Sequence, residues 1–335
     1  MLCVLATLKA SLRVKRTELR GRFSFLRIAI VGTGGVGGYF GSLLARAGED
    51  VTFIARGYHL DAMSQHGLQI FSDLSGDFVI HPEATQDTKN VGPVDVVIFC
   101  VKMYHNAQAI PDMSPLVGEE TTVLTLQNGV ENGDQISKVY PDAHVMIGSA
   151  FVQARIKEPG VIVQQGQLGR VVFGEIDPGK TDKGERMFEA FQRGDWNVEL
   201  TENAPGLVWQ KFIYLAGSAA VNAASGATYG EMRQIASTRA LLEAVFAEGA
   251  ALAKAKGVVF DEDPVEKSLE LMDGFPADGQ SSLAKDFAAG SSVELEGLTG
   301  AIVRMGREFD IPTPLNDALY AILEPAAEKI ANSKT

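Results

Sequence analysis

Six consecutive residues near the start of the chain, Gly32-Thr33-Gly34-Gly35-Val36-Gly37, match the pattern G-x-G-x-x-G. They follow a β-branched run, Arg27–Val31, and precede apolar residues at helical spacing, which is the context of a dinucleotide-binding turn. The first glycine permits a tight turn, the second lets the backbone approach a pyrophosphate, and the last lets helix and strand pack closely. The helix N-terminus would present N–H groups and a positive dipole end to the phosphates. We expect these six residues to bind a dinucleotide, and a glycine-rich turn without a ligand is the lesser alternative.

Arg56 bears on which dinucleotide binds. An enzyme that uses NAD carries Asp or Glu at the end of the second strand, where the carboxylate binds the ribose hydroxyls. This chain has Ile54-Ala55-Arg56 there, and its acidic residues Glu49 and Asp50 come before the strand, at the wrong end. An arginine at this place suits a 2′-phosphate, so we expect NADPH as the cofactor. The alternative is that Arg56 is a solvated surface charge.

Polar residues also follow two further apolar runs, Val94–Val101 and Thr121–Leu126. Ligands of open α/β sheets bind outside the carboxyl ends of the strands. Lys102 and Asn128 come directly after these two runs and are therefore expected to contact cofactor and substrate. Asn128 could instead belong to a simple Asn-Gly turn.

The elements that would position these residues change character along the chain. Strands that are apolar throughout, alternating with helical patterns, predict a parallel, doubly wound Rossmann-type sheet. From Pro205 onward the pattern is helical. We therefore expect an α/β dinucleotide-binding domain over residues 27–204 and an all-α substrate and catalytic domain over residues 205–335, with the active site between them.

The first 26 residues differ from the rest, with six basic side chains against one acid, Glu18. A targeting segment is one interpretation, because transit peptides are basic and poor in acids. We favour a disordered extension, or a start codon placed too early. The folded protein is then expected to begin at Arg27, and deletion of residues 1–26 should leave the fold intact.

Composition excludes several classes of protein. The net charge of −12 over 335 residues argues against nucleic acid as a partner, because phosphate binding needs a basic surface. No apolar stretch reaches the ~20 residues that span a bilayer. The two cysteines, Cys3 and Cys100, cannot form a disulfide framework or a four-cysteine zinc site, and we expect no metal. A cytoplasmic protein fits these features.

Several short motifs occur in a fixed order along the chain: the glycine-rich loop, Cys100-Val101-Lys102, Gln127-Asn128-Gly129, Trp209-Gln210-Lys211, Ser281-Ser282-Leu283-Ala284-Lys285-Asp286 and Glu294. In these motifs the chain resembles the ketopantoate reductases (2-dehydropantoate 2-reductases), from about Arg27 to the C-terminus. The resemblance implies that NADPH reduces the keto group of a small 2-oxo acid. The default reaction is 2-dehydropantoate to pantoate, in pantothenate biosynthesis, and a homodimer is possible.

The resemblance also implies roles for individual residues. Lys211 would be the proton donor, and Glu294, also counted as catalytic, would lie at the junction of cofactor and substrate. Ser282 would contact the substrate, and Ala154 would be among the residues that bind the cofactor.

The residues themselves agree that Lys211 could be the acid. Reduction of a ketone needs an acid for the developing alkoxide, and all five histidines lie in the N-terminal half of the chain. Lys211 stands in an apolar helical stretch, so a structural cation whose stem packs on the core is the alternative. His105 is a rival acid.

Three positions depart from the family pattern. The family presents asparagines to the substrate where this chain, counted without gaps, has Leu215, Ala219 and Tyr229. Ser218 and Asn222 lie on the same helix face as Lys211 and could rebuild a polar pocket, so we count both as substrate residues. Two alternatives stay open: a related reductase that acts on a more apolar keto substrate, and a non-catalytic NADPH sensor. Retention of Lys211 and Glu294 argues against the sensor.

Overall fold

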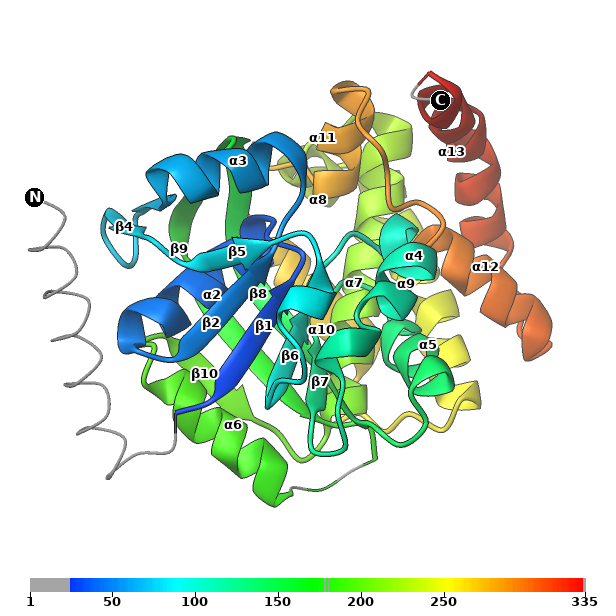
Figure 1. The fold of residues 1–335 in the computed structure, drawn as a ribbon. Helices are drawn as coiled ribbons and strands as arrows, with labels where there is room; N and C mark the ends of the chain where they lie inside the picture. Colours follow the sequence, from blue (N-terminus) through cyan, green and yellow to red (C-terminus); the bar gives the residue numbers. More distant parts are fainter. Residues whose placement is uncertain (1–24, 178, 180, 334–335) are drawn as a thin grey trace, which may run out of the picture.

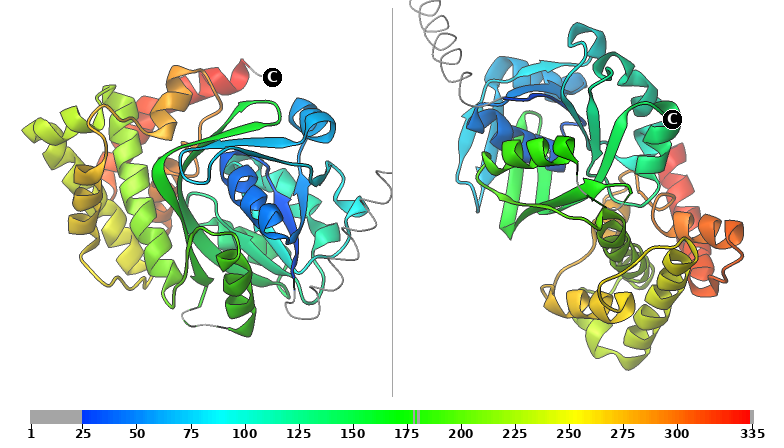
Figure 2. Two further views of the ribbon diagram at one scale, coloured as in Figure 1. Left: turned by 90° about the vertical axis from the view of Figure 1, so that its left-hand side faces the viewer. Right: turned by 90° about the horizontal axis from the view of Figure 1, so that it is seen from below.

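The computed structural model describes residues 25–177, 179 and 181–333 of the chain. Its N-terminal part is built around a sheet, and its C-terminal part consists of helices that pack against one side of that sheet (Figure 1; Figure 2, right). The change from strands to helices falls between Leu200 and Ala204, next to the expected boundary at Pro205. The basic extension lies outside the described residues, apart from Phe25 and Leu26.

Ten strands of the described residues form one sheet, in the order β4-β3-β9-β8-β7-β6-β1-β2-β5, with β10 beside β9. Their bounds are β1 Arg27–Val31, β2 Asp50–Ile54, β3 Leu68–Ser72, β4 Phe78–Ile80, β5 Glu83–Thr85, β6 Val96–Phe99, β7 Thr122–Thr125, β8 His144–Glu158, β9 Val161–Glu175 and β10 Asn197–Leu200. Strand β1 lies between β2 and β6, and the three strands are parallel. The chain first adds β2 on one side of β1 and later adds β6 on the opposite side. This is a topological switch point, where doubly wound sheets bind their ligands.

Strands β2, β1, β6, β7 and β8 are parallel to one another, as expected for a doubly wound sheet, and the rest of the sheet adds antiparallel pairs. Strands β8 and β9 pair antiparallel, as do β3 and β4. For β8 and β9 the reason is the Pro159-Gly160 turn, where Gly160 has φ of +77°. A two-residue connection can join only antiparallel strands, because a parallel pair needs a crossover of a dozen residues or more. The return strand of this hairpin, β9, is as long as β8.

In the described part of the chain, five helices accompany the sheet: α2 Gly35–Ala47, α3 Gly57–His66, α4 Asn106–Asp112, α5 Asn132–Val139 and α6 Asp182–Gln192. Helix α2 ends at Gly48, which has φ of +102° and donates its N–H to Ala45 and Leu44, as a left-handed C-cap does. All four residues of β6 and all four of β7 are buried, which explains why these strands are apolar throughout.

Seven helices follow: α7 Ala204–Ser225, α8 Tyr229–Gln234, α9 Ala236–Ala255, α10 Pro264–Gly274, α11 Ser282–Ala288, α12 Thr299–Glu308 and α13 Pro314–Asn332. Helix α7 begins at an N-cap, Asn203, whose side chain accepts the N–H of Gly206 at 3.0 Å. It packs against α9, α10, α11 and α13 on one side and against β8 and β9 on the other (Figure 2, left). The helix that carries Lys211 therefore runs along the border between the two parts.

Strand β1 begins at Arg27, as expected, and the two residues before it, Phe25 and Leu26, also make contacts. The Leu26 side chain is 2% exposed, and the Leu26 N–H donates to Glu49 Oε2 at 2.7 Å. Glu49 is itself buried and forms an ion pair with Arg193 at 2.7 Å. The Arg193 guanidinium lies 5.7 Å from the centre of the Phe25 ring. Deletion of residues 1–26 would thus remove core contacts.

In the described part of the chain, no helix is long and apolar enough to cross a membrane. Among those same residues, no group of three or more His, Cys, Asp or Glu side chains could hold a metal ion.

Candidate active site

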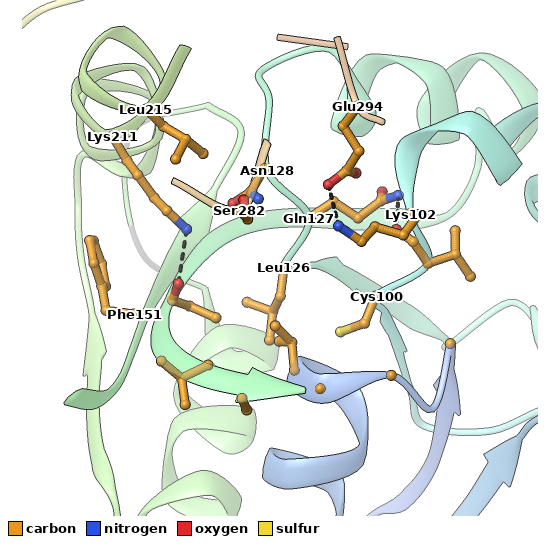
Figure 3. A pocket seen from close by; sticks show the side chains of 18 of the residues that line it. Cys100, Lys102, Leu126, Gln127, Asn128, Phe151, Lys211, Leu215, Ser282 and Glu294 are labelled. Carbon is orange, nitrogen blue, oxygen red and sulfur yellow. Dashed lines mark hydrogen bonds and ion pairs between the residues drawn. The ribbon is translucent and has the colours of Figure 1, made fainter. Parts of the chain in front are cut away.

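A large cleft runs along the carboxyl ends of β1, β2, β6 and β7 and continues between the sheet and the helical part. Most of the expected site residues line it, from both parts of the chain: the glycine-rich loop as far as Val36, Arg56, Lys102, Asn128, Ala154, Lys211, Ser282 and Glu294. The exceptions are Gly37, Ser218 and Asn222. Figure 3 shows Lys211 and Leu215 pointing into this cleft from α7, opposite the Lys102–Glu294 pair.

The glycine-rich loop has the shape that a phosphate site requires. Gly32 has φ of +98°, and a Cβ there would lie 2.7 Å from the Val101 nitrogen. A Cβ on Gly35 would lie 2.1 Å from the Ala154 carbonyl oxygen, so only glycine allows β8 to pass this close to α2. A Cβ on Gly34 would meet nothing within 4 Å, which leaves open space in front of the first turn of α2. The loop residues therefore fit the pyrophosphate of a dinucleotide, whose phosphates would face these N–H groups.

Thr33 takes a structural part in the same loop. Its hydroxyl donates to the Ile54 carbonyl at 3.1 Å, and the side chain is buried. This bond ties the turn after β1 to the end of β2.

Arg56 lies at the carboxyl end of β2 and is the N-cap residue of α3. Its guanidinium forms an ion pair with Asp112 at 3.2 Å, and both side chains are about half exposed. Such exposed pairs stabilise by only ~0–1 kcal/mol, so a phosphate could displace Asp112. His59, which sequence analysis did not select, lines the same part of the cleft and accepts the Gly160 N–H at 3.1 Å.

Glu294 connects the helical part to the sheet edge. Its Oε2 lies 2.8 Å from Lys102 Nζ, and its Oε1 accepts the Met103 N–H at 3.0 Å. Asp286 lies 3.8 Å from the same Nζ. Burial acts to lower the pKa of Lys102, but the charges of Glu294 and Asp286 outweigh it and raise that pKa above its ordinary value. Lys102 is therefore a permanent cation, positioned at the end of β6.

Lys211 has an unusual environment at the border of the two parts. Its Nζ donates to the Ala150 carbonyl at 2.9 Å and lies 5.1 Å from the centre of the Phe151 ring. Burial lowers the pKa of Lys211 to about 8, while the charge of Glu294 acts in the opposite direction. An acid with a pKa near the working pH is suited to general acid catalysis, because it is protonated and still gives its proton readily.

The carboxyl ends of β6 and β7 are tied together by Gln127, a residue whose motif was noted but whose role was not anticipated. Its buried amide donates to the Val101 carbonyl and to Asn106 Oδ1, both at 2.7 Å. The neighbouring Asn128 carbonyl accepts from Asn132 at 2.7 Å, so this turn is held rigidly. The Asn128 side chain lies on the cleft side, close to Ser282 and Leu215 (Figure 3).

Ser218 and Asn222 do not line the cleft, which corrects the expectation that they rebuild a polar substrate pocket. Both are fully buried inside the helical part. Asn222 Oδ1 accepts the Ser281 N–H and hydroxyl, each at 2.8 Å, so this asparagine holds the turn before α11. Ser282, at the first position of α11, is thereby placed at the cleft. Ser218 and Asn222 do share a face of α7 with Lys211. C-terminal to Leu215, however, α11 and the turn before it pack over that face.

Phe151 and the Ala150 carbonyl are the contacts of Lys211 that sequence analysis missed. No local signal marks them, because they belong to the long strand β8 and meet Lys211 only through the packing of α7 on the sheet.

Comparisons with known proteins agree with this geometry. The family model described as ketopantoate reductase PanE/ApbA matches residues 28–178, and its C-terminal counterpart matches residues 203–327. A 2-dehydropantoate 2-reductase from Pyrococcus horikoshii is 29% identical over 299 residues, which cover 89% of this chain and 97% of that protein.

Two solved structures are similar over most of their length. A PanE/ApbA family ketopantoate reductase from Ralstonia eutropha is 32% identical with a TM-score of 0.83, covering 91% of this chain and 99% of the other. A D-mandelate dehydrogenase, solved with NADH and anilino(oxo)acetate, has a TM-score of 0.82 at 21% identity, covering 91% and 99%, and shares the fold. By the match of both family models over most of its length, this chain belongs to the ketopantoate reductase family of oxidoreductases.

Proposed function

We propose that this protein uses NADPH to reduce the keto group of a 2-oxo acid to a hydroxyl, with 2-dehydropantoate to pantoate as the reference reaction. One observation carries the proposal. A lysine whose pKa is lowered to about 8 faces the same cleft as a glycine loop with the shape of a dinucleotide site.

The proposed cofactor contacts follow the cleft. The backbone N–H groups from Gly34 to Val36 would bind the pyrophosphate, beside Ala154. Arg56 would bind the 2′-phosphate as a charge-assisted pair after releasing Asp112. The nicotinamide would lie toward Lys102, Asn128 and Glu294, and it supplies a hydride when bound.

In the proposed mechanism Lys211 gives its proton to the oxygen of the reduced keto group. The Ala150 carbonyl accepts one N–H of the ammonium, which leaves other N–H groups free to bind the keto oxygen. Glu294 holds Lys102 at the sheet edge and keeps the pKa of Lys211 from falling further. Ser282 would contact the carboxylate of the substrate from the start of α11.

The test is NADPH oxidation by the purified protein with a panel of 2-oxo acids that includes ketopantoate. We expect turnover with at least one acid and loss of it in Lys211→Ala. NADPH binding without turnover across the panel would instead favour the sensor.

A homodimer stays a prediction, which analytical ultracentrifugation checks.

A second candidate, a reductase for a more apolar keto substrate, is favoured by one contact. Leu215 lines the cleft one helical turn after Lys211, at a place where the family presents an amide. The same panel separates the two candidates.

A further inference from the structure

Three aromatic rings stand together in the wall of the cleft, beside the proposed proton donor. Tyr214 stacks on Phe275 with ring centres 5.3 Å apart and planes 13° from parallel. Tyr229 meets the same Phe275 ring at 5.4 Å and 56°. All three residues line the cleft that contains Lys211 and Ser282, and we call them the aromatic wall.

The aromatic wall lies next to the site of proton transfer. Tyr214 and Leu215 follow Lys211 by three and four residues on α7, so the three side chains share one helix face. On the other side of Lys211, the Phe151 ring lies 5.1 Å from Nζ. A substrate whose keto oxygen contacts Lys211 thus has apolar side chains on both flanks.

The wall is held in place before any ligand binds. The Tyr229 N–H donates to the Gly279 carbonyl at 3.0 Å, and a Cβ on Gly279 would lie 2.9 Å from the Tyr229 ring. The Arg233 guanidinium donates to the Phe275 carbonyl at 2.7 Å. The Tyr214 and Tyr229 side chains are only 7% and 6% exposed. Rings that are already ordered lose little entropy when they bind a ligand.

The electrostatics of the wall fit an apolar group. Burial raises the pKa of Tyr214 and that of Tyr229 above their ordinary values, so both phenols stay neutral. Where the family presents amides, the cleft here has Leu215 and Tyr229, while Ala219 is buried away from it. A hydroxyl on the substrate would lose its water here without an amide partner, which costs ~1–3 kcal/mol.

We propose that the physiological substrate is a 2-oxo acid with a bulky apolar side chain, aromatic before aliphatic, which packs between Leu215 and the aromatic wall. This inference rests on the proposed function and narrows it to one substrate class. Leu215 and Tyr229 are the specificity-determining residues, because each stands where the family has an amide: Leu215 is apolar, and Tyr229 presents a ring whose hydroxyl pairs with Tyr214.

Four substrates of matched chemistry test the proposal with the full-length protein and NADPH. Ketopantoate and 3,3-dimethyl-2-oxobutanoate differ only by the hydroxyl, and phenylpyruvate and phenylglyoxylate carry an aryl group. We expect kcat/KM to rise from ketopantoate to its deoxy analogue and to be highest for an aryl acid, about 10-fold or more above ketopantoate. Ketopantoate as the best of the four would overturn the inference and leave the proposed function standing.

A binding measurement keeps the inference testable if none of the four acids is reduced. That result would overturn the proposed function. The melting temperature of the protein with NADP⁺ would then be measured with pantoate and with phenyllactate, the corresponding 2-hydroxy acids. A larger shift with phenyllactate supports an aromatic pocket, and an equal or larger shift with pantoate contradicts it.

Substitutions assign the preference to named residues. Phe275→Leu keeps an apolar side chain but removes the ring, and Tyr229→Asn introduces the family's amide. Each should lower the ratio of aryl to ketopantoate kcat/KM by about 10-fold, the size of one lost apolar contact. Phe309→Leu, on a ring outside the cleft, is the matched control and should leave the ratio unchanged. A ratio that stays at the parent value in both cleft variants, with NADPH affinity intact, would remove the wall from substrate selection.

Discussion

The cofactor half and the substrate half of the cleft are built in different ways. Around the glycine loop, the shape depends on backbone: Gly34 leaves open space, and Gly35 lets the Ala154 carbonyl approach. Around Lys211, the shape depends on side chains from distant segments, such as Phe151 and Glu294. Side chains can change one at a time while the fold is kept, whereas a Cβ at Gly32 or Gly35 cannot be accommodated. The substrate half is therefore where this chain can differ from its relatives.

The largest expected effect separates chemistry from cofactor binding. Lys211→Ala should lower kcat by about 10²–10⁴-fold, the usual contribution of a general acid, while NADPH still binds through the glycine loop. Lys211→Arg should not restore activity, because a guanidinium holds its proton too firmly. Stopped-flow kinetics and NADPH fluorescence titration measure the two properties. Lys256→Ala, outside the cleft, is the control, and full activity in Lys211→Ala would exclude this lysine from the mechanism.

The next effect concerns Arg56, the side chain proposed to bind the 2′-phosphate of NADPH. Arg56→Ala should weaken NADPH binding by about 1.5–3 kcal/mol, roughly 10- to 150-fold, because a charge-assisted phosphate contact is lost. NADH binding should hardly change. Asp112→Asn frees the guanidinium from its ion pair and should tighten NADPH binding slightly. Titration calorimetry with both cofactors checks this, and equal affinities for them in the parent protein would contradict the assignment of Arg56.

A smaller effect connects the two halves through Glu294. Because burial lowers the pKa of Lys211 to about 8, the protonated acid is present below that pH and is lost above it. We expect kcat/KM to fall as pH rises through about 8. Glu294 raises the pKa of Lys211, so Glu294→Gln should move this fall to lower pH. Glu296→Gln is the control, because the Glu296 side chain pairs with Arg304. If the pH profile of kcat/KM in Glu294→Gln equals that of the parent, Glu294 does not influence the pKa of Lys211.

The last prediction concerns the stability of the fold and leaves the site unchanged. A protein that starts at Phe25 should melt several degrees higher than one that starts at Arg27, because Leu26 is buried and its N–H binds Glu49. Loss of a buried leucine costs about 2–5 kcal/mol. Differential scanning calorimetry compares the two truncations, and Leu26→Ala in the full chain isolates the side chain. Equal melting temperatures would show that the fold does begin at Arg27.

Sequence reasoning was most successful where the signal is local. Strand β1 and the glycine turn follow one another directly in the sequence, and both were expected from residue type and local spacing. It predicted the parallel core of the sheet but not its antiparallel extension, because the Pro159-Gly160 hairpin was not recognised as the link between the two long strands β8 and β9. It wrongly placed Ser218 and Asn222 in the substrate pocket. Helical periodicity predicts which residues share a helix face but not which other segments cover that face.

By itself, the sequence determined the dinucleotide loop, the order of sheet and helices, and Lys211 as a candidate acid, since these depend on residue types at short spacings. Only the tertiary structure decided that Ala150 and Phe151 contact that lysine, that Glu294 pairs with Lys102, and that three rings stand beside them. The physical reason is burial. The pKa of Lys211 and the polarity of the pocket depend on which distant side chains exclude water from them, and spacing along the chain does not contain that information.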